Sequence, residues 1–250
     1  MRLLVTRAET DAGKLVRALE KMGCQVTVEP LLSVAFEEDV ALDLDGVQAL
    51  IATSRNALRA LKSHPALAQA LALPLFAVGR ATAEEARALG FATVITGAGT
   101  AQELVTHIVS VVDPAAGLLL HLSGDKLAVD VAGELEAHGF RVARVVVYRT
   151  LPAKALSETA VEQLAMGEID GVILLSPYTA SVYASLVRKQ GLATAVRQVT
   201  HFCLSEAVAR QLGPLGSLQV AIATRPSLEE LLARIAEHEG RSRSETGPGF

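Results

Sequence analysis

The stretch from Leu3 to Val26, LLVTRAETDAGKLVRALEKMGCQV, returns as LLHLSGDKLAVDVAGELEAHGFRV from Leu119 to Val142, at a constant offset of 116 residues. Each copy shows an apolar strand, an amphipathic helix, a glycine and a second strand, which is the pattern of a parallel βαβ unit. Weaker matches continue the repeat, such as Ser54 with Ser176, while the offset drifts to 127. Chance likeness of two apolar α/β sequences is the alternative. Matches that keep their order and include glycine and glutamate favour duplication.

The duplicated pattern predicts an α/β fold of two similar lobes, each a parallel sheet flanked by helices in the manner of flavodoxin or Rossmann domains. Two extended runs, EPLLSVAFEEDV (29–40) and VVVYRTLPAKAL (145–156), occupy matching points of the copies. Each is too long for one buried strand, so we expect them to be linkers that cross between lobes and pair as a ribbon. We expect residues 1–33 and 153–240 to form one lobe and residues 38–148 the other, with linkers at 34–37 and 149–152 and a disordered tail at 241–250.

Composition excludes several classes of protein. The net charge of −4 argues against nucleic acid or an anionic membrane as a partner, because no diffuse basic field exists. No apolar run is long enough to cross a membrane, and the N-terminal segment lacks the pattern of a signal peptide, so we expect a cytosolic protein.

Cys24 and Cys203 lie apart from other metal-ligating residues, so no metal site is expected. His121 lies in an apolar strand and is expected to be a hydrogen-bonded core residue, and the GAG at 97–99 is too short for a dinucleotide fingerprint.

Motifs along almost the whole chain resemble those of the uroporphyrinogen-III synthase family. They are LLVTR (3–7), LIATSRNALRAL (50–61), VGRATAEEARALGF (78–91), LHLSGD (120–125), VVVYRT (145–150) and LLSPYTA (174–180). The resemblance implies a cofactor-free enzyme that closes the linear tetrapyrrole hydroxymethylbilane and inverts its last ring, ring D, through a spiro intermediate with loss of water. It also implies two lobes with the substrate between them. We further expect a monomer that transiently contacts the enzyme preceding it in the pathway.

A substrate rich in carboxylates needs many hydrogen-bond donors, and the N-termini of helices at the carboxyl ends of parallel strands supply them. The expected substrate-binding residues are Arg7, Ser54, Arg55, Asn56, Gly79, Arg80, Ala81, Thr82, Ser123, Gly124, Ser176, Pro177 and Tyr178. A Ser, Thr, Asn or Asp in such a place is, taken alone, an ordinary helix N-cap. Asp125 in particular is expected to cap the helix over residues 126–137. What favours binding is that all these positions converge on one edge.

The resemblance assigns Tyr148 as the catalytic residue, because it matches the tyrosine that the family presents to the substrate. Its hydroxyl would assist the departing hydroxyl oxygen as the electrophilic azafulvene forms. An aromatic residue in the hinge is the structural alternative. The sequence departs from the family at Ser205, Glu206, Ala207 and Val208, where a glycine and two threonines are usual. Two donors are lost there, and Glu206 adds a negative charge.

A non-catalytic binding or sensor protein of two lobes is the competing functional hypothesis. It would share the duplicated lobes and the hinge. The sequence has no helix-turn-helix pattern and no signal peptide, and it carries the TSRNA, VGRATA and VVVYRT motifs together. These features favour the synthase.

Overall fold

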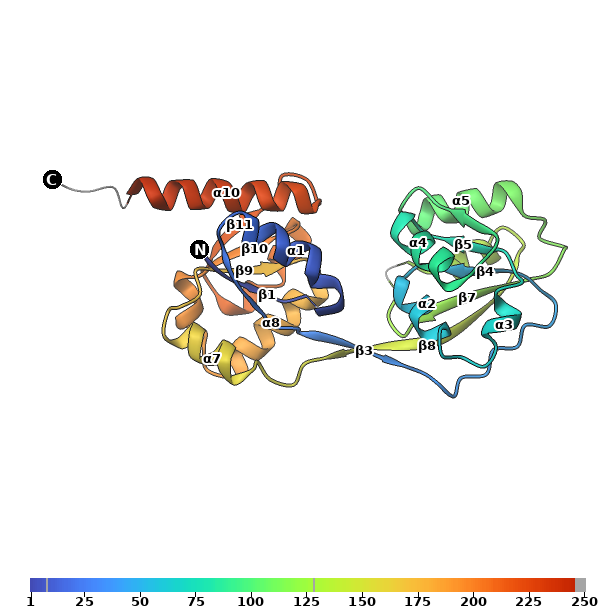
Figure 1. The fold of residues 1–250 in the computed structure, drawn as a ribbon, viewed down its shortest axis with the longest axis horizontal. Helices are drawn as coiled ribbons and strands as arrows, with labels where there is room; N and C mark the ends of the chain where they lie inside the picture. Colours follow the sequence, from blue (N-terminus) through green and yellow to red (C-terminus); the bar gives the residue numbers. More distant parts are fainter. Residues whose placement is uncertain (8, 128, 246–250) are drawn as a thin grey trace. The chain divides into compact units, whose positions relative to one another are not determined.

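The computed structural model describes residues 1–7, 9–127 and 129–245. The chain divides into two compact units, Met1–Ser33 with Pro152–Phe250 and Val34–Leu151. We call the first the terminal unit and the second the middle unit. Each contains a sheet flanked by helices, so the predicted α/β class is confirmed (Figure 1).

The sheet of the terminal unit is fully parallel, with strand order β11-β10-β9-β1-β2. Its strands are β1 (Arg2–Val5), β2 (Gln25–Val28), β9 (Gly171–Leu174), β10 (Thr200–Cys203) and β11 (Gln219–Ile222). Its helices are α1 (Glu9–Lys21), α7 (Glu158–Ala165), α8 (Pro177–Lys189), α9 (Glu206–Arg210) and α10 (Leu228–Glu245), with short 3₁₀ turns at Ala195–Gln198 and Gly213–Leu215.

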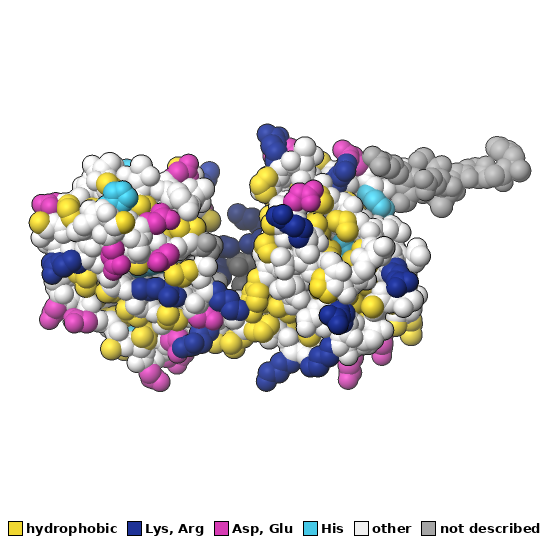
Figure 2. Space-filling model, turned by 180° about the vertical axis from the view of Figure 1, so that it is seen from behind, with side chains coloured by type: hydrophobic (Ala, Val, Ile, Leu, Met, Phe, Trp, Pro, Cys, Tyr) yellow, Lys and Arg dark blue, Asp and Glu magenta, His cyan; other side chains and the backbone are white. Residues whose placement is uncertain are grey.

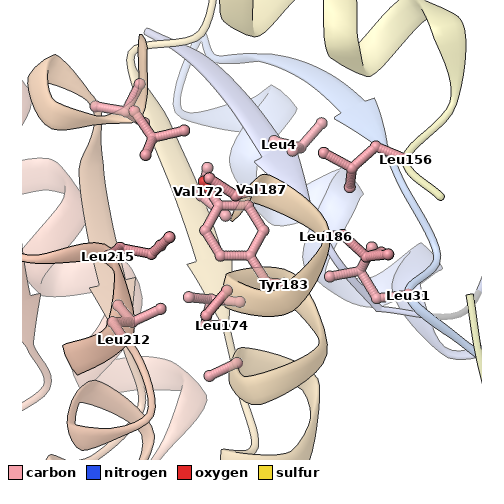
Figure 3. Close-up of a cluster of buried hydrophobic side chains, with 14 of the residues drawn as sticks. Leu4, Leu31, Leu156, Val172, Leu174, Tyr183, Leu186, Val187, Leu212 and Leu215 are labelled. Carbon is pink, nitrogen blue, oxygen red and sulfur yellow. The ribbon is translucent and has the colours of Figure 1, made fainter. Parts of the chain in front are cut away.

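Helices cover both faces of this sheet, because neighbouring strand residues point to opposite sides. Leu3 packs with residues of α1 and α10, whereas Leu4 packs with residues of α7 and α8. Figure 3 shows the cluster that contains Leu4, in which leucines and valines surround the Tyr183 ring of α8. Tyr183 is fully buried.

The sheet of the middle unit has strand order β3-β8-β7-β4-β5-β6. The strands from β8 to β6 are parallel to one another. The strands are β3 (Leu32–Phe36), β4 (Val47–Ala52), β5 (Leu75–Ala77), β6 (Val94–Thr96), β7 (Leu118–Gly124) and β8 (Arg141–Pro152). The helices are α2 (Arg55–Leu61), α3 (Leu67–Ala70), α4 (Arg80–Leu89), α5 (Ala101–Val111) and α6 (Val131–Glu136). α2 and α4 cover one face, and α5 and α6 the other.

The two long junction segments are paired strands. β3 and β8 are neighbours in the sheet, and the chain passes from one unit to the other along them. Ala153 N donates to Leu31 O at 2.9 Å, and Glu37 N donates to Val147 O at 3.0 Å. The residue number rises along one strand as it falls along the other, so the pair is antiparallel.

Several element boundaries differ from those expected. α6 begins at Val131, not at 126, and α8 begins at Pro177, not at 180, because proline suits the first turn of a helix. α10 continues to Glu245, so residues 241–245, expected in a disordered tail, are helical, and 246–250 lie outside the described residues. No helix in the described part of the chain is long and apolar enough to cross a membrane.

Candidate functional site

The parallel strands of the middle unit end at one edge of the sheet. Ala52 of β4 is in register with Ala77 of β5 and with Leu122 of β7, and Ala77 is in register with Thr96 of β6. The residues that follow these strand ends therefore lie along one line, which we call the middle edge. This line holds most of the predicted site residues.

The first part of the middle edge is the start of α2. The Ser54 side chain accepts a hydrogen bond from Asn56 N at 3.2 Å, and the Asn56 side chain accepts one from Arg59 at 3.2 Å. Ser54 is therefore an N-cap, as expected of a serine in this place. Ser54, Arg55 and Asn56 are half-buried, so each still reaches solvent.

The second part is the start of α4. Its N-cap residue is Gly79, so no side chain at that position accepts a hydrogen bond from the first turn. Arg80 and Ala81 are exposed, and Arg80 pairs with Glu84 at 2.8 Å. Thr82 is only 5% exposed, yet its hydroxyl makes no hydrogen bond to any residue that the structure describes. Thr82 does not cap this helix.

Two glycines let the neighbouring loop approach α4 closely. A Cβ at Gly97 would lie 2.8 Å from Val78 O, and one at Gly79 would lie 3.2 Å from the Cα of Gly99. The GAG segment therefore has a packing role, and it leads into Thr100, the N-cap of α5.

Gly124 and Tyr148 complete the middle edge. They are neighbours in the register of β7 and β8, where the register shifts by one residue. A Cβ at Gly124 would lie 2.6 Å from Cζ of Tyr148, so the tyrosine ring occupies the space beside the glycine. Tyr148 is half-buried against the core cluster that α2 and α4 cover. Among the described residues, none is hydrogen-bonded to the Tyr148 hydroxyl.

Asp125 has a different role from the one expected. The N-cap of α6 is Asp130, whose side chain accepts from Gly133 N at 3.1 Å. Asp125 instead accepts from Thr150 N at 3.0 Å with its side chain and donates its own N–H to Tyr148 O at 3.1 Å. The expectation that Asp125 caps the following helix is wrong. Its side chain bonds to Thr150 and its backbone N–H bonds to Tyr148, and these two bonds fasten the turn to β8 on both sides of Arg149.

Ser123 is a second difference. It is completely buried, its hydroxyl accepts from Arg144 Nε at 2.9 Å, and Arg144 also donates to Gly124 O at 2.8 Å. The structure thus brings the Ser123 side chain to the interior, where it positions Arg144, rather than to the middle edge. The sequence showed a serine after a strand but gave no sign of Arg144, which lies on another strand.

His121 lies beneath the middle edge and is fully buried. Its Nε2 is 3.3 Å from the Thr53 hydroxyl, and no described group is hydrogen-bonded to its Nδ1. Burial, followed by the positive charge of Arg144, lowers the pKa of His121 to about 4, against a smaller opposite effect of Asp130. His121 is therefore a core residue as predicted, but within the described residues only one of its ring nitrogens has a hydrogen-bond partner.

The terminal unit has its own line of strand ends. The Thr6 hydroxyl donates to Ile173 O at 2.7 Å, which ties β1 to β9, and Arg7 follows as an exposed side chain. Ser176 caps α8 by accepting from Thr179 N at 3.1 Å, and Pro177 and Tyr178 form the first turn. Arg7 and this helix start thus follow adjacent strands. Four of the predicted site residues therefore lie in the terminal unit, and the other ten lie in the middle unit. The four are Arg7, Ser176, Pro177 and Tyr178.

The start of α9 offers fewer donors. Ser205 is its N-cap but makes no side-chain cap, and Glu206 is exposed beside it. Both residues line a hollow of about 680 Å³ with Arg234 and residues of β11. Burial, followed by the Glu206 charge, raises the pKa of Cys203 to about 12, so this thiol stays protonated.

Charge is mixed on the face of each unit that Figure 2 shows. On the face of each unit shown in Figure 2, lysine and arginine are interspersed with aspartate and glutamate, without a broad patch of one sign. In the part of the chain that the structure describes, no three His, Cys, Asp or Glu side chains are grouped to hold a metal ion. Candidate donors for an anionic ligand are the helix starts and polar side chains at the strand ends of the two units.

Comparisons with known proteins agree with this architecture. Residues 13–233 match the family model described as uroporphyrinogen-III synthase HemD. The fold is similar to uroporphyrinogen-III synthetase from Helicobacter pylori, with 20% identity, a TM-score of 0.68, and coverage of 95% of this chain and 100% of that one. It is also similar to a mutant uroporphyrinogen III synthase from the extremely thermophilic bacterium Thermus thermophilus, with 17% identity, a TM-score of 0.54, and coverage of 98% and 99%. No curated protein sequence gives a significant match. At these identities the structural likeness establishes the fold.

Proposed function

The chain belongs to the uroporphyrinogen-III synthase family, and from that premise we propose how its own residues bind and cyclise the tetrapyrrole substrate. The family acts in tetrapyrrole synthesis, and its substrate is hydroxymethylbilane. The observation that carries the residue-level proposal is the Tyr148 hydroxyl, which lies at the middle edge without a hydrogen-bond partner among the described residues. We assign the reaction to the lyases that eliminate water. The cytosolic location, the monomeric state and the contact with the preceding enzyme stay predictions.

Substrate carboxylates would be held by hydrogen-bond donors of the middle edge and of the strand ends in the terminal unit. At α4 the backbone N–H groups of the first turn have no partner within the helix, and the Thr82 hydroxyl adds a donor next to them. Ser54, Arg55 and Asn56 supply the neighbouring donors. In the terminal unit, Arg7 and the start of α8 serve the same purpose. Ser123 is not among these contacts, because its hydroxyl is engaged inside the protein.

The chemical step begins when the bond between the methylene carbon and its hydroxyl oxygen breaks. The pyrrole nitrogen supplies the electron pair that replaces this bond, and the bonding pair leaves on oxygen. Tyr148 would give a hydrogen bond and then a proton to that oxygen, so that water departs. The substituted α-carbon of ring D then attacks the methylene carbon and gives the spiro intermediate. The bond from this carbon to the methylene of ring C then breaks, with an electron pair supplied by the ring C nitrogen. Ring D inverts, and its free α-carbon bonds to that methylene. This carbon finally loses its proton, which restores the pyrrole and the tyrosine hydroxyl.

Positioning would contribute more than proton transfer. The pyrrole nitrogen expels the leaving group by itself, so the protein's main task is to hold the chain of four rings so that closure occurs at the substituted carbon. Donors fixed at helix starts suit this task because they are part of rigid elements.

An assay with freshly prepared hydroxymethylbilane tests the function. Protein without added metal or nucleotide should form the type III product, separated from the type I isomer that arises without enzyme. Formation of type I alone at the uncatalysed rate would contradict the proposal. Tight binding of the substrate without turnover would favour the non-catalytic binding protein instead.

A further inference from the structure

The register of β3 and β8 places Phe36 beside Tyr148. Ala153 bonds to Leu31 and Glu37 bonds to Val147, and in both pairs the residue numbers have the same sum. An antiparallel pair keeps this sum along its length unless a bulge intervenes. The same sum pairs Phe36 with Tyr148, directly across the two strands.

Residues that face each other in an antiparallel pair project from the same side of the sheet. Phe36 and Tyr148 therefore share a face, and on the other side of Tyr148 lies Gly124 of β7. A row of three neighbours thus crosses β7, β8 and β3. The tyrosine ring fills the space at the glycine end, and Phe36 closes the other end of the row.

Phe36 is 39% exposed although its side chain is apolar. A single exposed apolar residue needs no explanation by itself. However, among the large hydrophobic side chains that the described residues expose, Phe36 alone is aromatic. It also lies next to Tyr148, whose hydroxyl has no hydrogen-bond partner among the described residues. Leu151, on the same ribbon, is 45% exposed but lies an odd number of residues from Tyr148 and so points to the opposite face.

We propose that Phe36 is a second substrate-contacting residue, whose ring stacks on the pyrrole that carries the hydroxymethyl group. This rests on the proposed function. The carboxylates of the substrate need donors, which phenylalanine lacks, but the pyrrole rings present aromatic faces that a phenyl ring contacts well. Tyr148 would serve the leaving oxygen, and Phe36 the ring from which it leaves.

The contact gains importance as the reaction proceeds. When hydroxide departs with its bonding electron pair, the pyrrole that bore it becomes positively charged. The face of a phenyl ring attracts a cation placed over it. Phe36 therefore favours the developing cation over the neutral substrate, and such an interaction raises the rate of the chemical step.

The test compares Phe36→Leu, Phe36→Tyr and the control Leu151→Ala with the wild type. Phe36→Leu keeps the apolar bulk but removes the aromatic face, so kcat/KM for the type III product should fall about 2- to 12-fold at an unchanged melting temperature. Phe36→Tyr should retain most of the activity, and Leu151→Ala all of it.

The outcomes separate this inference from the proposed function. The wild-type rate reports on the function, and the ratio of variant to wild type reports on Phe36. An active wild type with an equally active Phe36→Leu overturns the role of Phe36 alone, and so does an equal loss in Leu151→Ala, which would mean a general disturbance of the ribbon. A wild type that yields only the type I isomer overturns both.

Discussion

The ring of Tyr148 lies so close to Gly124 that a Cβ atom on the glycine would be 2.6 Å from Cζ and 2.8 Å from the hydroxyl oxygen of the tyrosine. Such distances are well below van der Waals contact. The absence of a side chain at Gly124 thus determines where the hydroxyl at the middle edge is held. Asp125 fixes the same place from the next residue, because its N–H bonds to Tyr148 O.

Gly124→Ala should therefore displace the tyrosine ring. We expect a loss of about 1–3 kcal/mol in the free energy of unfolding, typical of an overpacked site, together with a fall in kcat. In a Tyr148→Ala background the same change should cost little, because the ring is gone. Urea unfolding of the four proteins of this cycle measures the coupling. Gly213→Ala is the control, since a Cβ there meets nothing within 4 Å. Equal costs in both backgrounds would contradict the prediction.

Tyr148→Phe should slow turnover more than it weakens binding, because the hydroxyl interacts with an oxygen that gains charge only as it departs. Loss of a positioned proton donor costs about 10²–10⁴-fold in rate, and we expect the low end or less, since the pyrrole nitrogen supplies most of the driving force. The measurement is kcat at saturating substrate. Tyr183→Phe serves as the control, because its hydroxyl bonds to His201 in the core and its loss should lower stability alone. Wild-type turnover in Tyr148→Phe would make this tyrosine structural.

Thr82→Ala should raise KM and lower kcat/KM by about tenfold or more if the hydroxyl holds a substrate carboxylate, as for a hydrogen bond to a charged group. Its melting temperature should hardly change, because Thr82 does not cap α4. Thr100→Ala gives the matched comparison. It removes a true capping box at α5 and should lower stability by about 1 kcal/mol with unchanged KM. A stable Thr82→Ala with unaltered KM would remove this residue from the binding set.

The order of the strands and helices and most of the helix starts follow from local patterns, so the sequence predicts them. Apolar runs and their spacing locate strands and helices, and a serine after a strand predicts the caps at Ser54 and Ser176. Local rules fail where two candidates compete. The segment after β7 contains Asp125 and Asp130. In the structure Asp130 caps α6, while the Asp125 side chain is bonded to Thr150 of the neighbouring strand.

Contacts between distant strands were also beyond local reasoning. Ser123 looks like an exposed residue at a strand end, but Arg144 of the neighbouring strand reaches it in the interior. The position of Phe36 next to Tyr148 depends on a pairing between segments more than a hundred residues apart. Nothing in the run around Phe36 distinguishes it from an ordinary core residue.

Glu206→Gln should strengthen the use of a polyanionic substrate. Glu206 is an exposed carboxylate at the start of α9, on the side of the terminal unit where Arg7 and α8 offer donors. Removing its charge should raise kcat/KM about 2- to 5-fold at low salt, and the gain should shrink as salt screens the charge. Glu168→Gln is the control, because Glu168 is equally exposed but precedes β9 and lies at the opposite edge. The same gain in both variants would indicate only an effect of net charge.

Acid should destabilise the protein through its two fully buried histidines. Burial lowers the pKa of His201 to about 4, although hydrogen bonds of its ring with the backbone of Gln219 and Val199 act in the opposite direction. The pKa of His121 is lowered to about 4 as well. The ordinary value for the unfolded chain is 6.5. Between these values the unfolded state binds more protons, so stability is lost as the pH falls from 6.5 towards 4.

Each histidine should account for about 3 kcal/mol of this loss over the full window. His201→Gln tests the claim, because glutamine does not titrate and can still accept a bond from Tyr183. Urea unfolding at pH 7 and pH 4.5 should show a difference in free energy smaller by about 2–3 kcal/mol in the variant than in the wild type. His138→Gln, at an exposed position, should leave the wild-type difference unchanged. If His201→Gln also leaves it unchanged, the acid sensitivity lies elsewhere, and the buried imidazole of the terminal unit is not its source.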